Sequence, residues 1–211
     1  MKKFKPQVSK SHYFNFNKYD TKERWISYWH QINEVLKTKP KKVLEVGIGN
    51  RTVSDYLRKL KIKVITADID KALSPDYVVS VTELSTVFNK NSFDTTLCAE
   101  VLEHLPFKYF EGALQELHYV TKNYLILSLP HFGVDVLLNF KLPLVRKMEF
   151  AIKLPYPKKH KFDGEHYWEI GKKGYSLRKI LRIISKWYYI EKTYLVPENP
   201  YHRFFVLKVK K

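Results

Sequence analysis

The sequence predicts an α/β protein built on a doubly wound, mostly parallel sheet that ends in an antiparallel strand pair. Short apolar segments typical of strands alternate with segments whose apolar residues recur at helical spacing. One apolar segment, residues 43–46, runs directly into a glycine turn that contains Gly47 and Gly49. Two more, near residues 188–195 and 203–209, follow the last predicted helix and are expected to close the sheet as an antiparallel pair.

Two helices and four strands are expected in the first half of the chain. A helix is expected over residues 22–37, and its apolar side chains mark one face as buried: Trp25, Trp29, Ile32 and Leu36. After the strand at 43–46 and its turn, a second helix has its apolar residues at Val53, Tyr56, Leu57 and Leu60. Further strands are expected near Lys63, Tyr77 and Asp94.

The second half continues the alternation. Pro106 opens a helix, where proline is favoured, with the apolar residues Phe110, Ala113, Leu114 and Leu117. A strand is expected over residues 124–129. Ser176 is expected to cap the last helix, with Leu177, Ile180, Leu181 and Ile184 facing inward.

Composition sets outer limits. A chain of 211 residues with 45% hydrophobic content suits one domain with an ample core. No run approaches ~18 uninterrupted apolar residues, and the start lacks the apolar stretch of a signal peptide, so we expect a cytoplasmic protein without a transmembrane segment. The single cysteine, Cys98, cannot form an internal disulfide and is interpreted as a core residue.

The glycine turn can cradle either the pyrophosphate of a dinucleotide or the aminoacyl end of S-adenosylmethionine. A dinucleotide turn ends in a third glycine, and Thr52 stands in that place. Glu45, two residues before the first glycine, is poorly placed beside phosphates and well placed for an ammonium or sulfonium ligand. The turn therefore favours a cationic ligand.

Asp68 supports a nucleoside ligand. It ends the next apolar strand, 63–67, where a carboxylate can accept both ribose hydroxyls of a bound adenosine. The alternative is that Asp68 merely caps the loop into Asp70 and Lys71.

Several motifs now resemble those of class I S-adenosylmethionine-dependent methyltransferases, specifically the small type 11 group. Val43 to Asn50 is similar to the family's first motif, residues 67–70 to its second, and residues 92–106 to its fourth-strand motif. His166-Tyr-Trp-Glu-Ile and the helix after Ser176 are similar to its closing loop and final helix. The resemblance spans roughly residues 40 to 210 and implies a Rossmann-like fold of the class I methyltransferase type.

The same resemblance implies which residues contact S-adenosylmethionine. They are Glu45, Gly47, Gly49, Asn50, Arg51, Asp68, Ile69, Val81, Thr82 and Glu100. Two positions depart from the family pattern. Arg51 replaces the family's third glycine, where it can pair with the methionine carboxylate, and Ser80 stands where an acid often precedes the adenine loop.

Glu100, Glu103 and His104 stand at i, i+3 and i+4, so they share a face in one helical turn, and His131 follows the next strand end, where it can meet them. The pattern resembles the metal site of small-RNA 3′-terminal 2′-O-methyltransferases and, in part, of ubiquinone-pathway O-methyltransferases. That resemblance implies a divalent ion, Mg²⁺ or Mn²⁺, held by these four residues. The alternative is that Glu100, His104 and His131 act in catalysis as bases or hydrogen-bonding groups without metal.

Four regions are expected within the single domain: a basic N-terminal helical cap at 1–41, a cofactor-binding core at 42–130, a lid insertion at 131–173, and a final helix with two closing strands at 174–211. The lid is long, aromatic and basic, and is expected to cover the acceptor with His166, Tyr167 and Trp168. The alternative is an excursion that only packs on the sheet.

The positive charge is concentrated in the flanks. Residues 42–140 carry a net charge of −2, whereas residues 1–41 carry +7 and residues 141–211 carry +12. This distribution predicts an anionic partner, for which RNA, an anionic membrane surface and a phosphorylated metabolite all qualify. The alternative is a solvated lysine surface.

The preferred function is methyl transfer to a hydroxyl of a small, lipid-linked or sugar-linked acceptor by in-line displacement. Two alternatives stay open: an RNA methyltransferase that uses the basic flanks, with metal-assisted 2′-O-methylation, and a catalytically silent S-adenosylmethionine-binding module.

Overall fold

The computed structural model describes residues 4–140, 148–156 and 158–211. Its main sheet has seven strands in the order β3-β2-β1-β4-β5-β9-β8. The strands are β1 (Lys42–Val46), β2 (Lys63–Asp68), β3 (Tyr77–Val78), β4 (Phe93–Ala99), β5 (Thr121–Pro130), β8 (Tyr188–Val196) and β9 (Asn199–Val209). The first five are parallel, and β9 pairs antiparallel with both β5 and β8. The predicted fold class is confirmed.

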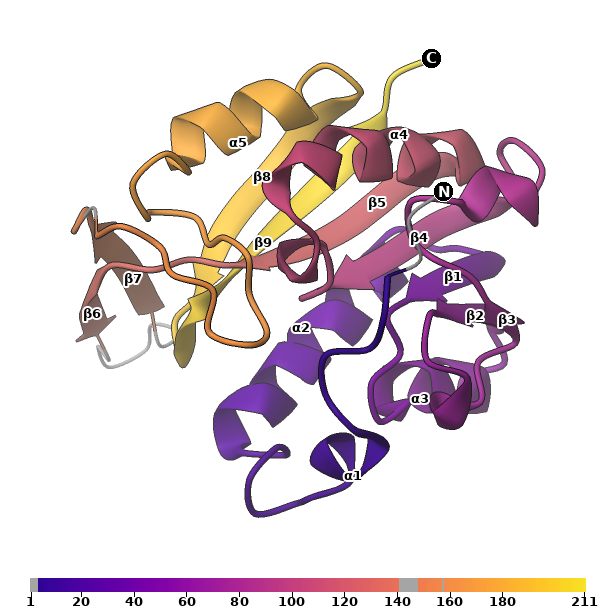
Figure 1. Cartoon of the computed structure of the whole chain (residues 1–211), viewed down its shortest axis with the longest axis horizontal. Coiled ribbons are helices and arrows are strands. Elements are labelled where there is room, and N and C mark those ends of the chain that lie inside the picture. Colours follow the sequence, from indigo (N-terminus) through magenta and orange to yellow (C-terminus); the bar gives the residue numbers. More distant parts are fainter. Residues whose placement is uncertain (1–3, 141–147, 157) are drawn as a thin grey trace.

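Helices cover both faces of this sheet, as Figure 1 shows. On one face lie α2 (Lys22–Lys37) and α3 (Thr52–Lys59), whose buried side chains join one apolar cluster. On the other lie α4 (Phe110–Val120) and α5 (Leu177–Ile184), whose buried side chains join a larger cluster. Short helical turns complete the chain: α1 (Lys10–Tyr13), η1 (Lys71–Leu73), η2 (Leu84–Thr86), η3 (Leu102–His104) and η4 (Phe107–Tyr109). Cys98 is buried in β4.

The buried face of α2 differs from the one predicted. Trp25 and Trp29 are 48% and 60% exposed, and the buried face instead carries Ser27, Tyr28, Gln31, Glu34 and Val35. Polar groups are tolerated there because they are paired: Ser27 Oγ lies 2.8 Å from His202 Nδ1, and Lys37 and Lys192 each donate to Glu34 Oε1. The prediction of the buried face from the apolar residues of this helix was therefore wrong. Tyr56 and Leu60 of the second predicted helix are exposed as well, while Val53 and Leu57 are buried.

The insertion after β5 forms a separate hairpin of β6 (Val134–Phe140) and β7 (Met148–Leu154), which projects beyond the main sheet in Figure 1. Residues 141–147 and 157 of the predicted lid lie outside the described residues, as do residues 1–3 of the predicted cap. In the described part of the chain, no helix is both long and apolar enough to cross a membrane.

Candidate active site

A cavity of about 640 Å³ opens at the carboxyl ends of β1, β2 and β4. Ligands of open parallel sheets bind at this edge. Glu45, Gly47, Asp68 and Glu100 line the cavity, and so do His104 and His166. The predicted cofactor motifs and two imidazoles therefore share one space.

The glycine turn is required by its backbone geometry. Gly47 and Gly49 have φ values of 78° and 48°, in the region that favours glycine. A Cβ on Gly47 would lie 2.2 Å from Cγ2 of Val101. Asn50 also lines the cavity, and its side-chain amide donates to Asp20 Oδ1 at 2.7 Å. The turn is thus in close contact with Val101 on one segment and with Asp20 on another.

Arg51 lies at the start of α3, outside the lining of the cavity. Its backbone has φ 67°, the conformation in which the family has glycine, and it precedes the first turn of α3. Its guanidinium donates to the carbonyl of Ser74 at 3.1 Å and lies 3.7 Å from Asp55, and Arg51 does not line the cavity. The pairing of Arg51 with a methionine carboxylate stays a prediction, and it would require the guanidinium to leave these partners.

Asp68 joins β2 to the glycine turn. Its Oδ2 accepts a hydrogen bond from the N–H of Ile48 at 2.9 Å, and its Oδ1 accepts one from the N–H of Asp70 at 2.8 Å. Burial raises its pKa despite these bonds. Ile69, Ser80 and Val81 line the cavity nearby, as an adenosine site would require. Thr82, predicted beside them, does not line it; its hydroxyl bonds to Ser80 Oγ at 2.8 Å.

Glu45 is a buried carboxyl group with an unsatisfied oxygen. Its Oε2 has no hydrogen-bond partner among the described residues, and burial raises its pKa to about 8. A buried carboxyl without a partner is costly when charged. A cationic ligand in the cavity would supply the missing partner, which fits the ammonium group of S-adenosylmethionine.

Glu100 does not share a helical turn with Glu103 and His104 as predicted. It has φ 53° and lies between β4 and η3, outside the helical turn. Ser128 Oγ donates to its Oε1 at 2.8 Å, and His202 Nε2 lies 3.7 Å from its Oε2. Its side chain is thereby fixed against β5 and β9 at the cavity wall.

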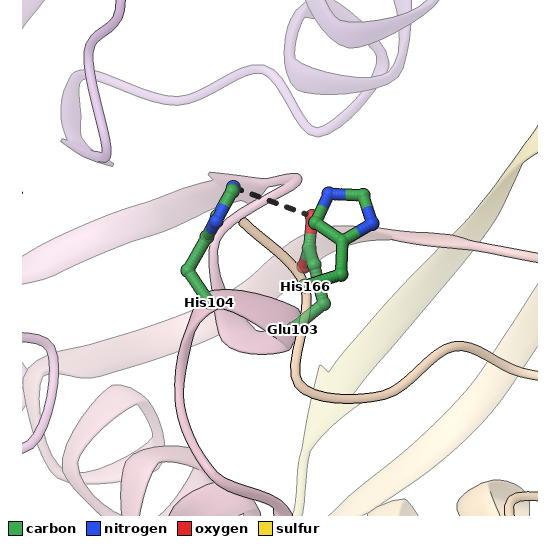
Figure 2. Close-up of side chains that lie close together, drawn as sticks. All are labelled: Glu103, His104 and His166. Carbon is green, nitrogen blue, oxygen red and sulfur yellow. Dashed lines mark ion pairs between the residues drawn. The ribbon is translucent and has the colours of Figure 1, made fainter. Parts of the chain in front are cut away.

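Glu103, His104 and His166 lie close together, and the two histidines line the cavity (Figure 2). Glu103 is fully buried, and neither of its oxygens has a hydrogen-bond partner in the described structure. Burial, together with the nearby Glu100 carboxylate, raises its pKa well above the ordinary value. His104 Nε2 lies 4.0 Å from Glu103 Oε1, as the dashed line in Figure 2 marks.

The pKa values of the two imidazoles are shifted in opposite directions. Burial, and then the neighbouring His166, lowers the pKa of His104 to about 4. Its Nδ1 lies 3.0 Å from the carbonyl oxygen of Glu165, which can only accept, so Nδ1 carries the proton and Nε2 the lone pair. Burial alone would lower the pKa of His166, but its hydrogen bond with Glu169 and the surrounding carboxylates raise it.

His166 is oriented by two neighbours. Its Nδ1 lies 3.4 Å from Glu169 Oε1 and 3.3 Å from the hydroxyl of Tyr201. The Nδ1–H can therefore donate to the carboxylate, and Nε2 has no partner among the described residues. An imidazole held by a carboxylate on one nitrogen and free on the other has the arrangement of a general base.

Two residues predicted at the acceptor lie elsewhere. His131 does not meet Glu103 and His104: its backbone bridges to Ile170, its Nδ1 accepts from Arg203 Nε at 2.8 Å, and it lines a second cavity. Burial, and then Arg203, lowers its pKa to about 3. Trp168 is fully buried, and its Nε1 donates to the carbonyl of Leu105 at 3.1 Å. Tyr167 and His166 do line the main cavity.

The cavity is covered mainly by a segment that sequence reasoning did not assign to the site. Residues 4–8 and the side chains of Tyr13, Tyr19 and Arg24 line it, whereas the predicted lid contributes only residues 165–167. Gln7 holds His104 directly, with its Nε2 donating to the His104 carbonyl at 2.9 Å. Of the aromatic residues of α2, Tyr28 lines the cavity and Trp25 and Trp29 do not.

Known methyltransferases resemble this chain in sequence over the cofactor motifs and in fold over most of its length. Residues 44–127 match the model of a family described as a methyltransferase domain, type 11. The match covers the part of the chain that holds the glycine turn and Asp68, and the fold is that of class I S-adenosylmethionine-dependent methyltransferases. No curated protein sequence matches the chain significantly.

Solved structures of low sequence identity share the fold. The 1,6-didemethyltoxoflavin-N1-methyltransferase of Burkholderia thailandensis, with bound 1,6-didemethyltoxoflavin and S-adenosylhomocysteine, has a TM-score of 0.63 at 12% identity over 95% of this chain and 85% of its own. The N-methyltransferase NodS of Bradyrhizobium japonicum has 0.62 at 10% over 95% and 96%. The methyltransferase domain of bacterial CtHen1-CN has 0.60 at 14% over 89% and 100%.

Proposed function

We propose that this methyltransferase transfers the methyl group of S-adenosylmethionine to a hydroxyl of a small, lipid-linked or sugar-linked acceptor. The observation that carries the proposal is a single cavity that joins Glu45, Asp68 and the glycine turn to His104 and His166. The methyl donor and a base can therefore meet in one space. A small acceptor is in keeping with the compound bound in the Burkholderia structure.

Methyl transfer itself asks the protein mainly for alignment, because the sulfonium is already activated. The S–CH₃ bond breaks as the O–CH₃ bond forms, and the sulfonium becomes a neutral thioether. A hydroxyl nucleophile must also lose its proton, and we assign that proton to Nε2 of His166. The resulting imidazolium would be stabilised by Glu169, 3.4 Å from Nδ1. An acceptor amine that is already neutral would depend less on proton removal by His166 and Glu169.

A second mechanism rests on the same cluster. Glu103, His104 and His166 each offer a ligand atom, and these atoms lie within 4.8 Å of one another. The unpaired buried carboxyl of Glu103 fits a bound cation. One carboxylate and two imidazoles suit Mn²⁺ better than Mg²⁺, which prefers oxygen ligands. When bound, such an ion would lower the pKa of an acceptor hydroxyl.

The proposal is tested by incubating the purified protein with methyl-labelled S-adenosylmethionine and fractionated lipid, small-metabolite and RNA pools, with and without a chelator. Label in the lipid or metabolite fraction, present in the product as a methyl ether, is the expected result. Label in RNA would replace the proposal with the RNA alternative, and no label in any fraction would favour the silent binding module. Loss of labelling with chelator, restored by Mn²⁺, would select the metal mechanism over the His166 base.

A further inference from the structure

A second cavity of about 470 Å³ lies at the base of the β6–β7 hairpin. Four cationic residues line it, namely Lys153, Lys172, Lys173 and Arg203, together with His131, and no acidic residue does. Because burial keeps His131 neutral near neutral pH, the four cations set the charge of this cavity. Nothing in the proposed methyl transfer uses it.

The charges in this cavity are only partly compensated. Lys153, 4% exposed, pairs with Asp135, and Lys172 lies 3.9 Å from Glu169 Oε2. Within the described residues, no carboxylate lies within 4.0 Å of Arg203 or Lys173. The guanidinium of Arg203 donates to neutral partners, His131 Nδ1 at 2.8 Å and Thr193 Oγ1 at 3.2 Å.

An uncompensated cation in a partly buried position is unfavourable, and burial lowers the pKa of Arg203 to about 10. Buried charges in proteins are normally paired. Arg203 is thus a partly buried cation without a counter-charge, and Lys173 adds an exposed one. Together they match the two negative charges of a phosphate monoester.

The backbone around the cavity adds donors. Ser176 and Leu177, at the start of α5, line the cavity, and the first amides of a helix have no partners within the helix. Gly171 has φ 88°, and a Cβ there would lie 2.1 Å from the carbonyl oxygen of Phe132. The close approach of these two segments, which glycine permits, shapes the cavity wall.

We propose that this basic cavity is a binding site for a phosphate group. Tyr201 lines the active-site cavity and Arg203, two residues further along β9, lines this one, so the phosphate can belong to the methyl acceptor. That last step rests on the proposed function, whereas phosphate binding itself does not.

The phosphate can come from a soluble ester or from a lipid headgroup. The hairpin face opposite Lys153 is apolar by register, and Val134, Leu138, Phe150, Ile152 and Leu154 on it are 41–52% exposed. Acyl chains would find an apolar surface beside the cavity. Both sources are therefore tested.

The first arm measures thermal unfolding and calorimetric binding of inorganic phosphate without cofactor, at constant ionic strength set with chloride. The wild type is expected to bind, and Arg203→Gln and Lys173→Gln to bind about tenfold more weakly, because each removes a charge-assisted donor. Lys173 is exposed, so its variant keeps the test valid if Arg203→Gln unfolds. Lys208→Gln, the same charge change on β9, is the control and should match wild type.

The second arm measures cosedimentation with phosphatidic acid vesicles, using phosphatidylcholine vesicles for comparison. Cosedimentation that Lys173→Gln weakens and Lys208→Gln does not would assign the phosphate to a lipid. Phosphate binding without cosedimentation would assign it to a soluble ester. The proposal is overturned if chloride replaces phosphate without loss of effect, or if Lys173→Gln and Lys208→Gln respond alike. Because no cofactor is present, either result is independent of methyl transfer.

Discussion

The carboxylate of Asp68 accepts a hydrogen bond from the backbone N–H of Ile48 at 2.9 Å, which ties the end of β2 to the glycine turn after β1. One residue thereby shapes two parts of the cofactor cavity. A ligand that uses the Asp68 carboxylate is positioned relative to the turn by the same contact.

We expect Asp68→Ala to weaken S-adenosylhomocysteine binding at least about tenfold, since it removes both a ribose acceptor and the anchor of the turn. Calorimetric titration measures the change. Asp55→Ala, which removes an exposed carboxylate from α3, is the matched control and should bind normally. Equal affinity in the two variants would remove Asp68 from the site.

Glu45 should release a proton when the cofactor binds. Burial raises its pKa to about 8, so it is mostly protonated at pH 7 in the free protein, and a nearby ammonium group would lower that pKa. Titrations in buffers of different ionisation enthalpy should show close to one proton released at pH 7. Glu45→Gln should release none and bind more weakly. The same proton count in both proteins would contradict this role.

His166→Asn should lower kcat by roughly 10²- to 10⁴-fold, the usual contribution of a general base, and leave the Kd for S-adenosylhomocysteine unchanged. His118→Asn, on α4, is the control. An equal loss in both variants would point to a structural effect.

The pH profile gives a separate test of this base. His166 must be neutral to accept a proton, so the rate should fall as pH drops through its pKa, which is raised above the ordinary 6.5. Glu169→Gln removes a carboxylate that raises this pKa, and the acid limb should then move to lower pH. A limb that stays in place would rule out Glu169 as the positioning residue.

Trp168 and Tyr167, adjacent in the chain, should behave differently. Trp168→Ala removes a fully buried ring and is expected to cost about 3–5 kcal/mol of unfolding free energy. Tyr167 is 38% exposed and lines the cavity, so Tyr167→Ala should leave stability within about 0.5 kcal/mol and raise KM for the acceptor. Urea denaturation and steady-state kinetics measure the two effects. Similar destabilisation by both would show that Tyr167 is a core residue.

The sequence predicted the helices and strands around the cofactor site well, because each of them depends on residues that are close together in the chain. The strand, glycine turn and helix around Gly47, the bounds of α2 and the capping of α5 by Ser176 each depend on neighbours within a few residues. The face of α2 depends instead on what packs against it. Ser27 and Glu34 are buried because His202, Lys192 and other distant groups pair with them, which no helical period encodes.

The acceptor side of the site was harder to predict for the same reason. His131 follows a strand end as expected, but Arg203 from β9 binds its ring and fixes it in the second cavity. Gln7 and Glu165 reach His104 from segments 97 and 61 residues away in the chain. The N-terminal cover of the cavity has no motif, because its position is defined only by tertiary contacts.

Calorimetric titration of the purified protein with S-adenosylmethionine and S-adenosylhomocysteine tests the central claim most directly. The structure predicts saturable binding of both ligands to one site, weakened by Asp68→Ala and unaffected by Asp55→Ala. No binding of either ligand at millimolar concentration would contradict the assignment of this cavity to the methyl donor.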